Sequence, residues 1–350
     1  MNFDLTEDRQ MLQDTLRRYL ADKYGIEHRN KVAYAEPFHD PAKWGELTEL
    51  GALFALAPEE AGGMGGAGFD IAVVFEELGR TLCPEPVLGA LMASRLLTAA
   101  GADQEELLAG SKTYAVGLGE LDAPYDLTSM TTTVSGGKIT GRKSIVYGGQ
   151  DADAFLIAAK EGDSLSVYEV AASDASVTGY ALMDGAGAAE VVLENAPATL
   201  ILSDAGAAID DAINAGILAL CSEAVGAMDV LHAMTVDYLG QRKQFGRPIG
   251  TFQVLQHRAV DMLTEIEQSR SIVIKAAAEL GGPDAGKYCS MAKNLIGRAG
   301  RLVAEEAIQM HGGIAMTWEY PGSHYAKRII MIDAQLGDTD YHLARVAQAA

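Results

Sequence analysis

Apolar side chains recur at helical spacing through the first part of the chain. Behind Thr6, a plausible N-cap, they fall at Leu12, Leu16 and Leu20, a pattern that predicts an amphipathic helix. Further helical segments are expected at 41–51, 70–80 and 87–100. The glycine-rich run at 62–66 predicts a loop between them. Residues 1–110 are therefore predicted to form an N-terminal all-α domain.

Short β-prone segments replace this pattern in the middle of the chain. They lie at 113–118, 131–134, 138–140, 144–147, 154–159, 164–170 and 189–194. Glycine, aspartate and asparagine separate them, as is typical of strands joined by turns. The spacing predicts a small antiparallel β barrel or sandwich over residues 111–203.

Helical periodicity returns after Asp204 and continues to the end of the chain. Apolar residues recur every three or four positions from Ile209 to Tyr238, which predicts a helix much longer than the globular average. Two more long segments follow, at about 252–280 and 285–310. Because long helices with short connections pack as antiparallel bundles, residues 204–350 are predicted to form a C-terminal four-helix bundle with subunit contacts. The expected fold class is a multidomain α+β protein.

Composition and charge exclude several function classes. The chain has 350 residues and is 49% hydrophobic, which is enough to bury large cores. Its formal net charge of −21 repels phosphate backbones and anionic lipid headgroups, so neither nucleic acid nor a membrane is an expected partner. The N-terminus has no leader pattern, and the apolar runs look too short and interrupted to cross a bilayer. We expect a cytoplasmic protein.

The cysteines and histidines do not predict a metal site. Cys83, Cys221 and Cys289 are widely spaced and are expected to be reduced core thiols. The histidines of the C-terminal half have no second ligand at metal spacing.

Two segments near the expected ends of the bundle helices have the chemistry of an anion site. Arg242 follows the long helix, where a guanidinium can form a paired hydrogen bond to a pyrophosphate oxygen. Gln253 lies at the expected start of the next helix, where its amide and the helix N-terminus can face the same ligand. Gly312 and Gly313 leave backbone N–H groups open to a flat or charged group. The alternative is that Arg242 complements the helix dipole and the glycines cap a helix.

Three stretches resemble the acyl-CoA dehydrogenase family, and together they cover nearly the whole chain. They are residues 53–63 (LFALAPEEAGG) with 76–80 (EELGR), residues 241–249 (QRKQFGRPI) with 252–253, and residues 309–315 (QMHGGIA) with 317–321. The resemblance implies dehydrogenation of an acyl-CoA thioester between its α and β carbons, with FAD as cofactor and an electron-transfer flavoprotein as acceptor. It also implies a homo- or hetero-tetramer with another acyl-CoA dehydrogenase chain.

The same resemblance implies which residues contact the cofactor. In the family, the second and third stretches clamp the pyrophosphate and adenine part of an FAD that sits on a neighbouring subunit. The corresponding residues here are Arg242, Gln244, Phe245, Gln253, Gln309, Gly312 and Gly313.

The carboxylate that removes the substrate α proton has no direct counterpart in this chain. Most family members carry it as the Glu of a Tyr-Glu-Gly-Thr stretch, and residues 335–339 read Gln-Leu-Gly-Asp-Thr here. Counted without a gap from Pro321 the base position holds Leu336, and aligned on Thr339 it holds Gly337. Neither side chain can accept a proton.

A second position, on the first bundle helix, serves as the base in some members and corresponds to Ala233 and Met234. The nearest acids to the two positions are Asp338 and Asp229. Asp229 lies on the face of Ala233 because of its i to i+4 spacing. Both aspartates are candidates for the catalytic base, and the simpler interpretation is that they are solvated or cap a helix.

The middle domain also departs from the family pattern. The family lines the flavin ring with a Thr-Glu-Pro turn and a Trp-Ile-Thr-Asn stretch, whereas this chain has GLGELDAP at 117–124 and IVYGG at 145–149. The half of the site that reaches toward a partner's FAD is therefore retained, and the half that would hold a ring is altered.

This asymmetry resembles the small subunits of paired acyl-CoA dehydrogenases, which act on dicarboxylic, aromatic-derived or steroid side-chain CoA esters. Our hypothesis is a subunit of a heteromeric acyl-CoA dehydrogenase that lends Arg242, Gln253 and the 309–313 segment to FAD on a catalytic partner. One alternative is a self-sufficient homo-oligomeric dehydrogenase with Asp338 or Asp229 as a displaced base. The other is a non-catalytic scaffold subunit, since fold alone does not give activity.

Overall fold

The computed structural model describes residues 5–162 and 164–349 and divides into two compact units. Unit 1 consists of Met1–Ile26, Ile71–Cys83 and Ile217–Ala350, and unit 2 consists of Glu27–Asp70 and Pro84–Gly216. The units do not follow the domain boundaries expected near residues 110 and 204, so those boundaries stay a prediction. Helices α4 and α7 each cross from one unit into the other.

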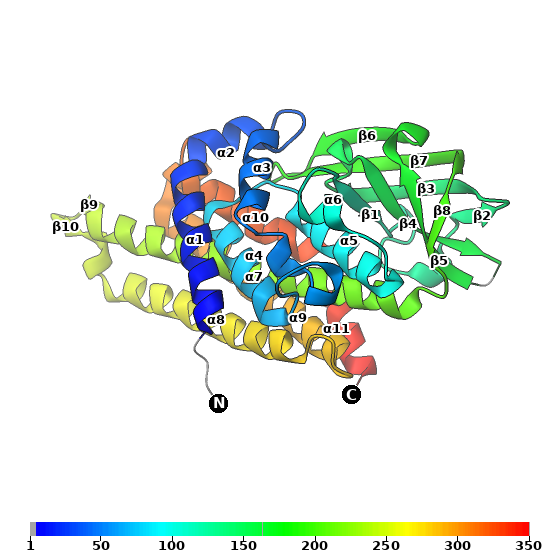
Figure 1. Cartoon of the computed structure of the whole chain (residues 1–350). Helices are drawn as coiled ribbons and strands as arrows, with labels where there is room; N and C mark the ends of the chain where they lie inside the picture. The colour runs from blue at the N-terminus through cyan, green and yellow to red at the C-terminus, as the bar shows by residue number, and fades with distance from the viewer. Residues whose placement is uncertain (1–4, 163, 350) are drawn as a thin grey trace. The chain divides into compact units, whose positions relative to one another are not determined.

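The first third of the chain is helical, as the periodicity predicts (Figure 1). The helices are α1 (Glu7–Lys23), α2 (Ile26–Ala33), α3 (Pro41–Glu49), α4 (Gly68–Thr81), α5 (Val87–Ala100) and α6 (Glu105–Leu108), with short 3-10 turns at Phe54–Leu56 and Glu59–Ala61. Thr6 is the N-cap of α1, and its hydroxyl accepts a hydrogen bond from the Arg9 N–H.

An eight-stranded sheet fills the middle of the chain and belongs to unit 2. Its strands are β1 (Tyr114–Gly117), β2 (Thr133–Ser135), β3 (Lys138–Tyr147), β4 (Ala154–Glu161), β5 (Ser164–Ala171), β6 (Ser176–Ala181), β7 (Gly187–Pro197) and β8 (Thr199–Leu202). They follow the order β6-β7-β3-β2-β4-β5-β8, with β1 paired to β4. Most pairs are antiparallel, as expected, but β1–β4 and β2–β4 are parallel. Alternate side chains such as Phe155, Ile157 and Val191 form a buried core on one face of the sheet.

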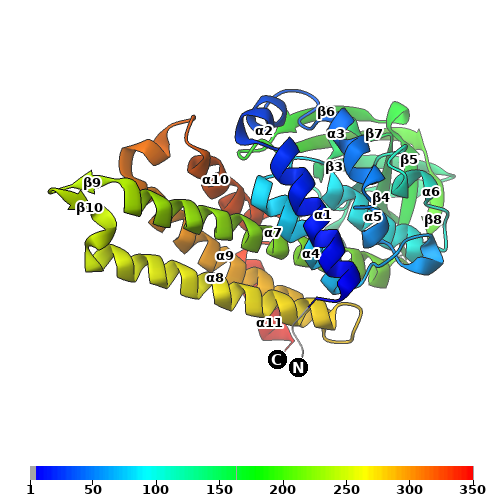
Figure 2. The same ribbon diagram turned by 60° about the vertical axis from the view of Figure 1, so that its left-hand side comes forward.

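The last part of the chain is helical again. It consists of α7 (Gly206–Gln241), α8 (Gln253–Glu279), α9 (Ala285–His311), α10 (Pro321–Ala334) and α11 (Thr339–Gln348). A two-stranded hairpin of β9 (Lys243–Gln244) and β10 (Arg247–Pro248) joins α7 to α8, and a 3-10 turn at Gly312–Met316 follows α9. Figure 2 shows α8 and α9 running alongside the second part of α7, with the hairpin projecting beyond the bundle end.

Helices α4 and α7 cross within unit 1 at two reciprocal glycines. A Cβ on Gly79 would lie 2.0 Å from the Glu223 carbonyl oxygen, and one on Gly226 would lie 2.0 Å from that of Glu76. Only glycine therefore allows the two backbones to approach this closely. The crossing brings the polar face of α4 beside Asp229 on α7.

One expectation from the sequence was wrong. By length and composition α7 is apolar enough to cross a membrane, although the apolar runs had looked too short and interrupted. In this fold 72% of its most apolar window is buried inside the protein, so the hydrophobicity is explained by core packing.

Candidate functional site

The implied cofactor contacts after α7 lie on an exposed hairpin. Its loop residues Phe245 and Gly246 have φ of +52° and +77°, the left-handed combination that a two-residue β-hairpin uses. Phe245 is 89% exposed, so little packing of its side chain offsets the strain of a bulky residue at positive φ. Its ring meets the edge of the Phe252 ring, with 6.1 Å between centroids. Phe252 precedes Gln253, the first residue of α8, so this contact ties the hairpin to the start of α8.

Arg242 joins the hairpin to α7. Its N–H donates to the Tyr238 carbonyl at 2.8 Å, and its carbonyl accepts from the Ile249 N–H at 2.8 Å. The guanidinium is exposed and has no hydrogen-bond or ion-pair partner within the described ranges. The backbone is thus fixed while the charge is available to an anion.

The implied contacts after α9 lie on a second exposed segment. Gln309, Gly312 and Gly313 are all exposed, and a Cβ at either glycine would meet nothing within 4 Å. Gly312 adopts φ 66° and ψ −144°, a conformation that only glycine takes without strain. The Gly312 N–H itself donates to the Ile308 carbonyl. An exposed guanidinium and side-chain amides are donors that suit a pyrophosphate, and the two glycines leave its approach free of side chains. The residues present therefore fit the phosphate part of FAD.

The loop at the base position, residues 335–339, has one acid, Asp338. A Cβ at Gly337, where φ is +104°, would lie 2.5 Å from the Tyr341 ring and 2.6 Å from His342 Nε2. Asp338 is the N-cap of α11 and accepts from the Tyr341 N–H at 2.8 Å. Leu336 is in the left-handed region, at φ +54°.

Buried donors hold this loop in place. The Lys293 ammonium on α9 is fully buried and donates to the Gly337 carbonyl at 2.6 Å and to the Asp333 carbonyl at 2.8 Å. Burial lowers the pKa of Lys293. His342 Nε2 lies 3.0 Å from the Leu336 carbonyl, and burial lowers the pKa of this imidazole to about 4. The loop is therefore fixed through its backbone.

A second buried cation lies beside the same loop. Arg328 on α10 makes a bidentate ion pair with Glu223 on α7, with both N···O distances 2.6 Å. It also donates to the Gln335 side chain at 2.9 Å. Sequence reasoning missed Lys293 and Arg328. The sequence does contain a signal for them, because each is a charged residue on the apolar face of its helix.

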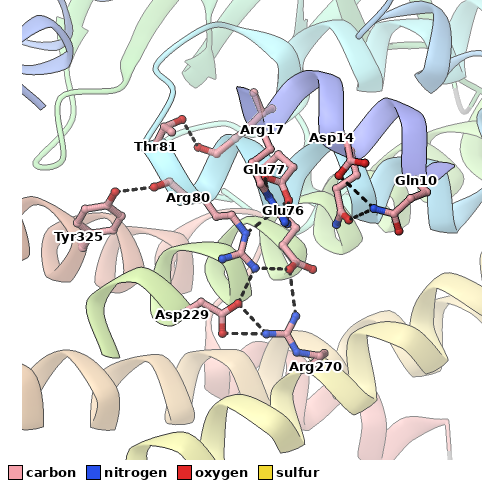
Figure 3. Close-up of polar contacts among 12 residues, drawn as sticks. Gln10, Asp14, Arg17, Glu76, Glu77, Arg80, Thr81, Asp229, Arg270 and Tyr325 are labelled. Carbon is pink, nitrogen blue, oxygen red and sulfur yellow. Dashed lines mark hydrogen bonds and ion pairs between the residues drawn. The ribbon is translucent and has the colours of Figure 1, made fainter. Parts of the chain in front are cut away.

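Asp229 belongs to a network of ion pairs rather than standing alone (Figure 3). It lies 2.7 Å from Arg80 on α4, and each of its oxygens lies 2.8 Å from Arg270 on α8. Glu76 bridges the same two guanidiniums, at 2.8 and 3.1 Å. Burial opposes the charge on Arg270, but Glu76 and Asp229 outweigh burial and raise the pKa of this guanidinium.

The network continues to the N-terminal helix. Arg17 on α1 makes a bidentate contact with the buried Glu77, at 2.6 and 3.0 Å. Ala233, one turn after Asp229, is exposed and carries no proton acceptor. The structure therefore gives Asp229 and Asp338 structural partners, and their assignment as a base stays a prediction.

In unit 2, the altered middle-domain segments surround a buried ion pair. Lys143 is fully buried and lies 3.1 Å from Glu120. Burial opposes ionisation of Glu120, but hydrogen bonds from Thr131 and Thr132 outweigh it and lower its pKa to about 2. Burial lowers the pKa of Lys143 to about 8, although Glu120 partly opposes that shift. This pair is a structural support for the strands.

Ile145 begins the IVYGG stretch that, by the resemblance, takes the place of the family's Trp-Ile-Thr-Asn stretch. It has φ +53° and lies within an irregularity of the β3–β7 pairing, between Lys143 and Val146. A β-branched residue in this conformation is a genuine outlier, and it leaves an aliphatic side chain, 41% exposed, at that position.

Comparison with known proteins gives the family. The N-terminal domain of acyl-CoA dehydrogenases matches residues 6–106, and their C-terminal domain matches residues 206–350. Acyl-CoA dehydrogenase IpdE2 of Mycolicibacterium smegmatis is 31% identical over 93% of both chains. The protein of the same name from Mycobacterium tuberculosis is 32% identical over 92% of this chain and 91% of that one.

Comparison with solved structures indicates the same family as the sequence comparison. The structure of the Tcur3481-Tcur3483 steroid ACAD G363A variant superposes with a TM-score of 0.90 at 28% identity, covering 98% of this chain and 97% of that one. The fold, with an N-terminal helical domain, a middle β-sheet domain and a C-terminal helical domain, is the one expected from the sequence. The chain belongs to the acyl-CoA dehydrogenase family, whose members are oxidoreductases acting on CH–CH groups.

Proposed function

We propose that this chain is a subunit of a heteromeric acyl-CoA dehydrogenase, of the small-subunit type that lacks the usual catalytic Glu. It binds the pyrophosphate side of an FAD whose ring lies on a catalytic partner chain, and that partner supplies the base. Bound FAD would accept the hydride that leaves the substrate β carbon. Arg242, Gln253 and the 309–313 segment would hold and orient the cofactor.

The base position carries this proposal. Gly337 is crowded by Tyr341 and His342, and Asp338 is occupied as a helix cap. At the second position, Asp229 has both oxygens in ion pairs with arginines. A general base needs a carboxylate that reaches the substrate proton in a water-excluded site. Asp338 is exposed at the start of α11 and Asp229 is held between two arginines, so we infer that the partner supplies the base.

We call the hairpin with the start of α8 and the 309–313 segment together the cofactor arm, and its exposure supports the same proposal. Arg242, Phe245, Gln253, Gln309 and Gly312 are all exposed in the single chain, on two segments at the ends of α7 and α9. An unpaired exposed guanidinium beside an exposed ring suits a ligand held by another subunit. A scaffold subunit would not need this donor set.

The relatives support a paired assembly and a substrate class. The similar steroid acyl-CoA dehydrogenase is named as a pair of chains, Tcur3481 and Tcur3483. For this chain we propose a hetero-tetramer with another acyl-CoA dehydrogenase chain in the cytoplasm, and an electron-transfer flavoprotein as the electron acceptor. Steroid-derived acyl-CoA esters are the first substrates to test.

Expression of the chain alone and together with its acyl-CoA dehydrogenase partner tests the proposal. The measurements are flavin absorbance and its bleaching by a panel of acyl-CoA esters. We expect the chain alone to be colourless or inert, and the pair to be yellow and bleachable. Yellow, bleachable protein from the chain alone would favour the homo-oligomeric alternative and send the search for the base to Asp338 and Asp229. A pair that never binds flavin would favour the scaffold alternative.

A further inference from the structure

Three rings, one buried and two half-buried, form a cluster where α7 and α9 end and α10 begins. His311 is 4% exposed, and its ring centroid lies 4.6 Å from that of Tyr238 and 4.9 Å from that of Tyr320. His311 Nδ1 lies 2.8 Å from the Ala307 carbonyl, and Nε2 lies 2.5 Å from the Tyr320 hydroxyl. Both nitrogens of the imidazole are therefore engaged.

The hydrogen-bond partners fix the direction of each bond. A carbonyl can only accept, so Nδ1 carries the proton and donates to Ala307. Nε2 is then the acceptor, and the Tyr320 hydroxyl donates to it. Burial, with Tyr238 and Asp237 nearby, raises the pKa of Tyr320, so this hydroxyl keeps its proton.

This hydrogen bond closes the glycine loop at its base. His311 is the last residue of α9, and Tyr320 is the N-cap residue of α10. The segment 312–320 between them begins with two glycines and presents outward the exposed side chains Ile314, Met316 and Trp318. Its backbone hydrogen bonds run from Thr317 to Ile314 and from Ser323 to Tyr320, and neither of them spans the loop. Side chains of α10 hold the middle of the segment, since Ser323 Oγ donates to the Thr317 carbonyl and His324 Nε2 lies 2.8 Å from the Trp318 carbonyl. The Tyr320 hydroxyl differs from these in joining the two ends of the segment.

The same cluster connects the two halves of the cofactor arm. Tyr238 stacks on His311 through its ring, and its carbonyl accepts the N–H of Arg242. Arg242 is thus hydrogen-bonded to the backbone of Tyr238, and Gly312 is covalently bonded to His311. A pyrophosphate held between the guanidinium and the glycine loop requires their spacing to be set within a fraction of an ångström.

We propose that Tyr320 is a positioning residue which, through His311, sets the Gly312–Gly313 loop at the correct distance from Arg242 for FAD binding. The inference rests on the proposed function, because it assumes that these two segments hold FAD. Tyr320 and His311 do not touch the reacting atoms. They act by making the arm rigid before the cofactor arrives.

Substitution Tyr320→Phe tests this, with Tyr325→Phe as a matched control. Tyr325 lies on α10, is buried where Tyr320 is half-buried, and donates to the Arg80 carbonyl at 2.5 Å, away from the glycine loop. Each change deletes one hydroxyl and leaves one buried acceptor short of a donor, so both should lower the melting temperature by about 2–4 °C. Only Tyr320→Phe should weaken FAD binding by the complex with the partner chain, by about tenfold.

FAD affinity is measured by quenching of its fluorescence, and Arg242→Ala is included to test the proposed function separately. Strong weakening by Arg242→Ala, tenfold weakening by Tyr320→Phe and an unchanged Tyr325→Phe complex would support the inference. Weakening by Arg242→Ala with normal FAD affinity in Tyr320→Phe would overturn the inference and leave the proposed function standing. Normal affinity in Arg242→Ala would overturn both.

Amide hydrogen exchange in the chain alone gives a second readout that needs no cofactor. Tyr320→Phe should speed exchange across 312–320, and Tyr325→Phe should not. Equal exchange in both variants would mean that the hydroxyl does not close the loop, which would overturn the inference.

Discussion

Substitution Asp229→Asn separates an ion-pair role from a base role. The change keeps the shape of the side chain and removes its charge, leaving Arg80 and Arg270 to share Glu76. Asp229 is 20% exposed and its two arginines 26% and 27%. Breaking a fully buried pair costs about 3–5 kcal/mol and an exposed pair about 0–1 kcal/mol. We therefore expect a loss of about 2 kcal/mol, seen as a melting temperature lower by roughly 4 °C.

Glu267→Gln provides the control within the same network. Glu267 is 58% exposed and lies 3.7 Å from Arg270, so its loss should change the free energy of unfolding by less than about 0.5 kcal/mol. Turnover of the assembled enzyme by the Asp229→Asn variant should stay within about threefold of the unmodified protein. A drop of more than about a hundredfold, with the melting temperature unchanged, would refute this reasoning and make Asp229 the base.

Three further outcomes are expected. Gly337→Glu should not give the chain dehydrogenase activity of its own, because the new side chain at positive φ meets packed rings; flavin bleaching by acyl-CoA in the chain alone would contradict this. Glu223→Gln should cost about 3–5 kcal/mol by leaving Arg328 buried without its carboxylate, and a melting temperature within a degree of the unmodified protein would show the pair to be unimportant. Glu85 and Asp151 outweigh burial and raise the pKa of His39 above 6.5, so its stabilisation should be complete below that pH and disappear as pH rises through the raised value. Urea unfolding of His39→Gln and of the unmodified protein should therefore converge toward alkaline pH, and a constant difference would contradict the assignment.

The helices and strands could be predicted because their signals are local. The N-cap at Thr6 and the apolar spacing along α7 depend on neighbours within a few residues. The parallel pairing of β1 with β4 could not, because it joins Tyr114 to Ala154 and no turn signal marks it. Pairing across such distances is decided by the packing of the whole sheet.

The candidate site shows the same division. The spacing of Arg242 and the two glycines is a motif, so these positions could be proposed from the sequence. The surroundings of Asp229 could not, because its arginines come from α4 and α8 and meet only when the bundle forms. A helical wheel shows Asp229 as a lone acid on one face. Tertiary packing turns it into the centre of a network.

Unit 1 is built from three separate stretches of the chain, which affects the order in which the two units can fold during synthesis. Its first two stretches end at residues 26 and 83, and the rest begins only at residue 217. The ribosome adds 194 residues after Glu76 before it reaches Arg270, and 245 residues after Arg80 before it reaches Tyr325. Both stretches of unit 2 are complete by residue 216, so that unit can fold on the ribosome while α1 and most of α4, from Ile71 on, still lack their surroundings. We therefore expect the early helices of a nascent chain to stay exposed until the last residues are made, and a chain that terminates early to leave α1 without its packing partners.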